Sequence, residues 1–193
     1  GGGFEIWQYT SRTPVASSVP IQLGDLGIYA IKIKCKDVAK TFAYYKEQGV
    51  ETLSTPSKLP AGRNHFYIKD PYGNVFEIVE DDYWYTHNDC LTGAVCGVTI
   101  GVSSIEKSLP FYKNILGYDK QLFTGEGQFT DWQGVPGAQH AFKRVIMGHS
   151  RTLEGAFSKL FGPTSIELIE VTDRNPIKIF DNRYWGDLGF IHV

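Results

Sequence analysis

The sequence is short of the residues and patterns that mark several classes of protein. Its three cysteines (Cys35, Cys90, Cys96) are too few for a disulfide scaffold, and none belongs to a CxxC pair. Lysine and arginine total 19 against 21 for aspartate and glutamate, so the chain lacks the basic excess of nucleic-acid binders. No apolar run approaches the roughly 18 residues of a membrane span, and GGGFEIWQ at the start is no signal peptide. These absences predict a cytoplasmic protein that binds neither nucleic acid nor membrane.

Apolar and aromatic side chains, by contrast, are present in the proportions of a folded protein. Hydrophobic residues make up 42% of the 193 positions and aromatic residues 14%, enough for a core and for a pocket lining. The length suits one domain or two small ones. A local cluster of lysines is predicted to lie on a solvated surface of the first strand and helix; it comprises Lys32, Lys34, Lys36 and Lys40.

Internal repeats are the most informative feature of the chain. The tetrapeptide GDLG occurs at 24–27 and at 186–189, each time before a strand-like run. A glutamate between two apolar residues recurs three times, at Glu5, Glu77 and Glu167. Because neighbouring residues of a strand face opposite sides, each glutamate faces away from its apolar flanks. A carboxylate on an apolar face needs a partner, so the recurrence indicates a structural or functional position.

The order of predicted elements also repeats. The stretches 21–82 and 94–173 each predict a strand, a helix and three further strands, a βαβββ unit. Asp37 is the predicted N-cap of the first helix, and the capping box Ser103-x-x-Glu106 opens the second. The other segments are predicted to be the last strand of a preceding unit with its linker (1–20), a linker (83–93), and a linker with the first strand of a following unit (174–193). A longer protein of four units is therefore expected.

The segment DPYGN at 70–74, followed by VFEI at 75–78, resembles the vicinal oxygen chelate superfamily. That group contains glyoxalase I (lactoylglutathione lyase), extradiol dioxygenases and bleomycin-resistance proteins. The helix-forming stretch 103–117 is similar to the family's first-helix pattern. The resemblance implies an α+β (α/β) fold in which tandem βαβββ units form half-open barrels around a divalent metal, Zn, Ni, Mn or Fe.

The resemblance further implies that each unit supplies a His or Gln from its first strand and a Glu from its last strand to the metal. Carried over by position, the metal ligands would be Glu5, Glu77, Glu167 and His192. Glu77 and Glu167 are also the candidate catalytic acid/base groups. The first-strand positions of the two complete units are expected to be Ala30 and Gly97, and neither side chain can bind a metal.

Two functions stay open at this point. The first is a metal-dependent enzyme acting on a small molecule with vicinal oxygens, a lyase or isomerase rather than an oxygenase. An oxygenase would need two histidines and a carboxylate around Fe(II), and only His192 is suitably placed. The alternative is a metal-free small-molecule binding protein of the bleomycin-resistance type, which Ala30, Gly97 and the many aromatic residues favour. A weaker hypothesis is a pair of units that only scaffolds an active partner. A homodimer is a candidate assembly for all three.

Overall fold

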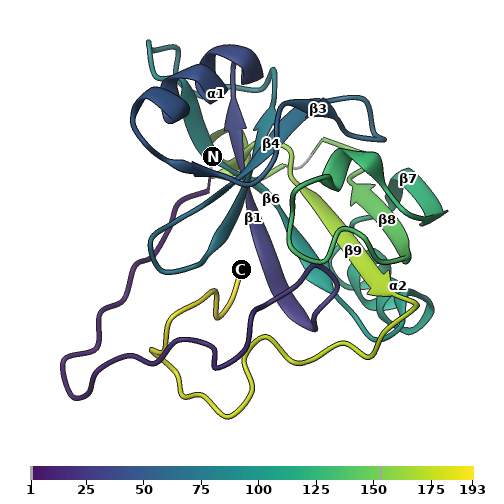
Figure 1. Cartoon of the computed structure of the whole chain (residues 1–193). Helices are drawn as coiled ribbons and strands as arrows, with labels where there is room; N and C mark the ends of the chain where they lie inside the picture. Colours follow the sequence, from purple (N-terminus) through teal and green to yellow (C-terminus); the bar gives the residue numbers. More distant parts are fainter. Residues whose placement is uncertain (1, 153) are drawn as a thin grey trace.

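In the computed structural model, the described residues, 2–152 and 154–193, build one mixed nine-stranded sheet with helices packed on it (Figure 1). The first half comprises β1 (Gly27–Cys35), α1 (Val38–Glu47), β2 (Glu51–Thr52), β3 (Ser57–Lys58), β4 (Asn64–Lys69) and β5 (Val75–Glu80). The second half comprises β6 (Thr92–Gly101), α2 (Ile105–Asn114), β7 (Lys120–Gly127), the 3-10 helix η1 (Thr130–Trp132), β8 (Phe142–Gly148), α3 (Ser158–Phe161) and β9 (Ser165–Val171).

The two halves of the sheet have the same topology. The strand order is β2-β4-β5-β1-β6-β9-β8-β7, and β3 pairs with β4 off this path. In each half the first strand pairs in parallel with the last, β1 with β5 and β6 with β9. Antiparallel pairing of β1 with β6 joins the halves at the centre. The predicted α+β fold of tandem βαβββ units is therefore confirmed, and the sheet is open rather than closed.

The helices begin where their capping residues lie. The Asp37 side chain accepts a hydrogen bond from the Lys40 amide and caps α1, as predicted. The cap of α2 is Ser104, one residue later than the predicted capping box, and it accepts from the Lys107 amide. Pro110 lies inside α2 without ending it.

The segments 4–7 and 189–193 are not strands, contrary to the prediction. A strand needs the backbone of a neighbour to take its hydrogen bonds, and neither segment pairs with a strand in the part of the chain that the structure describes. Close by, Gly2 forms a single bridge to Val95. Both termini lie close to the sheet in Figure 1, and the purple and yellow stretches that adjoin them loop out below it.

None of the helices in the described ranges is both long enough and apolar enough to cross a membrane.

Candidate functional site

Two of the predicted site residues meet at the centre of the sheet. Glu77 comes from β5 and Glu167 from β9, and both side chains are fully buried. The Lys32 side chain of β1 lies between them and is itself 3% exposed. Its Nζ donates to Glu167 Oε2 at 2.6 Å and also to Glu77 Oε2. The structure thus places a buried ammonium group between the two carboxylates.

The register of the strands explains why the sequence did not reveal this lysine. The predicted first-strand positions, Ala30 and Gly97, are two residues too early, because the residues opposite the two glutamates are Lys32 and Thr99. Thr99 Oγ1 donates a hydrogen bond to Glu167 Oε2 at 3.0 Å. Gly97 is needed for packing, since a Cβ there would lie 2.4 Å from the Ser165 carbonyl oxygen.

A second buried cation, Arg144 of β8, joins Glu167 to a third carboxylate, Asp131. Its Nη1 donates to both carboxylate oxygens of Asp131, at 2.9 and 2.7 Å, and its Nε donates to Glu167 Oε1. The guanidinium group lies over the Trp132 ring, 4.0 Å from the ring centroid. Arg144 therefore links η1 to β9 through a two-pronged and a single hydrogen bond.

The remaining member of the cluster is His65 on β4. Its Nδ1 lies 2.8 Å from Glu77 Oε1, and its Nε2 lies 3.1 Å from Ser57 Oγ and 3.7 Å from Asp131 Oδ2. We call Lys32, His65, Glu77, Thr99, Asp131, Arg144 and Glu167 the central cluster. Every oxygen of its two glutamates has a partner.

Sequence reasoning found the two glutamates of the central cluster and missed the cations. The prediction that Lys32 and Lys34 lie on a solvated surface is wrong, because both are 3% exposed. Their alternation with isoleucines in IYAIKIK was an available signal, since it puts both lysines on a single face of a strand in the middle of the sheet. Arg144 carried a similar signal, because in the strand FKRVIMG it lies on the opposite face from the exposed Lys143, among apolar residues.

Burial and charge act in opposite directions on the ionisable groups of the cluster. Burial alone would raise the pKa of Glu77, but Lys32 and His65 outweigh it and hold the pKa far below the usual range. Arg144 and Lys32 likewise lower the pKa of Glu167 against the effect of burial. Burial lowers the pKa of Lys32, yet the two glutamates raise it more, so this pKa lies above its ordinary value. Lys32, Glu77 and Glu167 are therefore charged at neutral pH.

These shifts predict how stability depends on pH. A carboxyl group whose pKa is lowered by folding stabilises the protein above its unfolded pKa, and this contribution is lost as the pH falls. We expect the free energy of unfolding, measured with urea, to decrease from about pH 5 downwards because of Glu77 and Glu167. Lys32, with a raised pKa, should add a loss of stability above about pH 10. Asp131 opposes the acid effect slightly, since burial raises its pKa more than Arg144 lowers it. If the free energy of unfolding of the Glu77→Gln variant fell with decreasing pH as much as that of the unmodified protein, this assignment would be contradicted.

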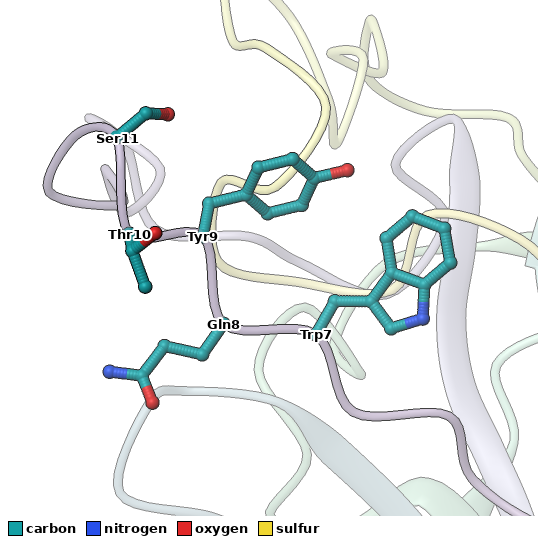
Figure 2. A pocket seen from close by; sticks show the side chains of 5 residues that line it. All are labelled: Trp7, Gln8, Tyr9, Thr10 and Ser11. Carbon is teal, nitrogen blue, oxygen red and sulfur yellow. The ribbon is translucent and has the colours of Figure 1, made fainter.

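Two other predicted metal ligands lie away from the cluster. Glu5 and His192 are both exposed, and the His192 ring stacks on Trp185 with ring centroids 5.5 Å apart. A hollow of about 380 Å³ lies beside them and is lined by residues 7–11. Figure 2 shows the rings of Trp7 and Tyr9 on one side of this segment and the Gln8 side chain on the other. The structure does not bring Glu5 or His192 to Glu77 or Glu167.

The side chains at the centre do not fit the divalent metal that the resemblance implies. A metal would need free carboxylate oxygens and neutral donors, whereas Lys32 presents an ammonium group to both glutamates. Within residues 2–152 and 154–193, no group of three or more His, Cys, Asp or Glu side chains could hold a metal ion. These side chains form a network of salt bridges rather than a set of metal ligands.

Comparison with known proteins finds a family model that matches part of the chain. Residues 9–78 match the model of the Glyoxalase/Bleomycin resistance protein/Dioxygenase superfamily. No curated protein matches the sequence. Among solved structures, glyoxalase I from Zea mays is 18% identical with a TM-score of 0.47, and the match covers 81% of this chain and 47% of that one. This chain thus spans about half the length of the maize protein.

A further similar structure is a variant of Streptomyces coelicolor methylmalonyl-CoA epimerase in complex with 2-nitronate-propionyl-CoA. It is 15% identical with a TM-score of 0.42, and the match covers 75% of this chain and 96% of the epimerase. At these identities and scores, neither structure carries an argument about activity. The family model does identify the unit that contains β1, α1 and Glu77. On that match, residues 9–78 carry the sequence pattern of the Glyoxalase/Bleomycin resistance protein/Dioxygenase superfamily.

Proposed function

We propose that the paired units, residues 27–171, are a metal-independent scaffold of this superfamily rather than a metal-dependent catalytic barrel. The observation that supports this most directly is the Lys32 ammonium group between Glu77 and Glu167. The ammonium group has the charge sign of a metal ion, and it binds the carboxylate oxygens that a metal ion would need. This favours the scaffold hypothesis over the lyase, isomerase or oxygenase chemistry that the resemblance implies.

The way the cluster is connected supports a structural role. Its side chains come from β1, β4, β5, β6, η1, β8 and β9, so the ion pairs join both halves of the sheet. Each side chain is at most 6% exposed. All four oxygens of the two glutamates already have partners within the protein, so none is free to bind a metal ion. The cluster instead fixes the two units against each other.

The metal content of the purified protein tests this proposal. Protein prepared without chelator or affinity tag should contain Zn, Ni, Mn and Fe far below one equivalent by elemental mass spectrometry. The double variant Lys32→His/Thr99→His places an imidazole opposite each glutamate, which is the ligand set that the resemblance describes. We expect this variant to bind about one equivalent of Zn or Ni.

A matched control comes from the neighbouring buried lysine. Lys34 donates to the Tyr83 carbonyl oxygen instead of a carboxylate, so Lys34→His should gain no metal. Near-stoichiometric metal in the unmodified protein would overturn the proposal and restore the metal-dependent enzyme. The small-molecule ligand, the homodimer and the cytoplasmic location remain predictions from the sequence.

A further inference from the structure

A second hollow lies where the linker after β5 meets the connection between β8 and β9. Its volume is about 380 Å³, and it is lined by Tyr83 of the linker and by residues of the segment 149–163. We call it the linker hollow. No member of the central cluster lines it, so it is a separate site. Its volume falls within the range of about 300–1,000 Å³ that is typical of small-molecule pockets.

Tyr83 joins the two walls of the linker hollow. The buried Lys34 holds it from below, because Lys34 Nζ donates to the Tyr83 carbonyl oxygen at 2.9 Å and lies 5.2 Å from the ring centroid. The Tyr83 hydroxyl donates in turn to the Lys159 carbonyl oxygen at 2.6 Å. Gly162, with φ of 65°, packs on the Tyr83 ring, where a Cβ would lie 2.3 Å from the nearest ring atom. The backbone beside Lys159 is therefore anchored to the first half of the sheet.

The start of the β8–β9 connection is anchored to the turn after α2. The His149 Nδ1 donates to the Gly117 carbonyl oxygen at 2.7 Å, and the ring packs on Tyr118 with centroids 4.3 Å apart. The amide and the hydroxyl of Ser150 donate to the two carboxylate oxygens of Asp119, at 2.8 and 2.6 Å. Asp119 is thus engaged by Ser150, and the residue that follows, Arg151, starts from a fixed point.

The charges that line the linker hollow are all of one sign. Arg151 and Lys159 line it, and no aspartate or glutamate does, although the chain as a whole has a net charge of −2. Glu154 is the one acidic residue of the segment 149–163, and it is not part of the lining. A hollow with two cations and no carboxylate attracts an anion.

Arg151 differs from the other five arginines of the chain in having no partner among the described residues. Four of the five pair with carboxylates and the fifth donates to two carbonyl oxygens; in order they are Arg12, Arg63, Arg144, Arg174 and Arg183. The Lys159 ammonium group also has no hydrogen-bond or ion-pair partner within residues 2–152 and 154–193. The guanidinium fork matches the oxygens of a phosphate or carboxylate group, so Arg151 is available for such a ligand.

We propose that the linker hollow binds a small phosphate monoester, with its phosphate group between Arg151 and Lys159. A phosphate monoester carries about −1.5 to −2 charges at pH 7, which two cations match, whereas a carboxylate carries a single charge. The hydroxyl group of Thr152, which also lines the hollow, adds a neutral donor. The organic part of the ester lies beside the Tyr83 ring and Pro163, which complete the lining. This site goes beyond the scaffold function and does not depend on the metal content of the central cluster.

Titration with glucose 6-phosphate tests the proposal. We expect saturable binding by isothermal titration calorimetry at pH 7 and low ionic strength, and none for glucose, which lacks the phosphate group. Inorganic phosphate should bind more weakly, because it has no organic part to contact Tyr83. Amide chemical-shift changes in the NMR spectrum should gather at 83 and within 149–163. Arg151→Ala should weaken binding about tenfold or more, since it removes a two-pronged contact to phosphate.

The controls separate a formed site from attraction by net charge. Lys46→Ala, at an exposed lysine of α1 outside the hollow, removes the same charge as Lys159→Ala. Lys159→Ala should weaken binding and Lys46→Ala should not, while Arg151→Lys should restore only part of the affinity lost in Arg151→Ala.

Three results would overturn the proposal. They are the absence of saturable binding, chemical-shift changes that lie outside the linker hollow, and an equal loss of affinity in Lys159→Ala and Lys46→Ala. Inorganic phosphate that binds as tightly as glucose 6-phosphate would contradict the assignment to an ester. Metal content does not enter any of these readouts, so their outcome is distinct from that of the scaffold proposal.

Discussion

Replacing Lys32 with methionine is expected to lower the free energy of unfolding by about 3–5 kcal/mol. The change removes the ammonium group and leaves the carboxylates of Glu77 and Glu167 facing each other in the interior. The two carboxylates keep His65 and Arg144 as partners, but they lose the cation between them, and a buried charge deprived of a partner is costly in the low-dielectric interior. Urea denaturation at pH 7, followed by circular dichroism, measures the loss.

A second substitution shows whether charge or shape causes the effect. In Lys32→Met/Glu77→Gln, one carboxylate becomes neutral while Glu167 keeps Arg144 and Thr99 as partners. This double variant should be more stable than Lys32→Met alone, which is the signature of coupling between contacting residues. A loss below about 1 kcal/mol for Lys32→Met would show that the pair is solvated and would remove the main support for the scaffold proposal.

The second large effect is expected at Arg144. Arg144→Met leaves Asp131 and Glu167 without their shared cation and should cost about 3–5 kcal/mol. The loss is expected because the guanidinium group makes a two-pronged bond to Asp131 and a further bond to Glu167 while fully buried. The fluorescence of Trp132, which lies under the guanidinium group, should change as the indole loses this contact.

Arg144→Lys provides the matched control because it keeps the charge and loses the planar fork. A single ammonium group cannot reach both Asp131 oxygens and Glu167 in the same geometry, so stability should recover only in part. Full recovery would mean that the charge alone matters and that the fork geometry of Arg144 contributes nothing measurable.

The local elements could be predicted because their signals lie within a few residues. Asp37 and Gly49 bound the first helix, and the turn at 70–74 and the alternation in β5 define the last strand of the first unit. Glu77 and Glu167 were found for the same reason, since a glutamate between two apolar residues is a local pattern. The family resemblance rested on residues 70–78 and 103–117, and the family model matches residues 9–78, which include the first of these segments.

The partners of those glutamates could not be predicted, because they depend on register between strands far apart in the chain. A shift of two residues keeps the same face of a strand and changes only which residue lies opposite, so periodicity did not separate Ala30 from Lys32. The strands proposed at 4–7 and 189–193 failed for a related reason. A segment with a strand-like sequence forms a strand only when a neighbouring backbone takes its hydrogen bonds.

By itself, the sequence determined the tandem βαβββ architecture, the two central carboxylates and the repeated GDLG loops, because each is encoded by spacing along the chain. Only the tertiary structure decided that Lys32 and Arg144 pair with these carboxylates and that Arg12 pairs with Asp187 and Arg174 with Asp25. Lys32 with Glu167 and Arg12 with Asp187 are contacts between residues more than 100 positions apart, and Arg144 meets Glu167 across the neighbouring strands β8 and β9. Their free energy depends on burial and distance, which exist only once the chain has folded.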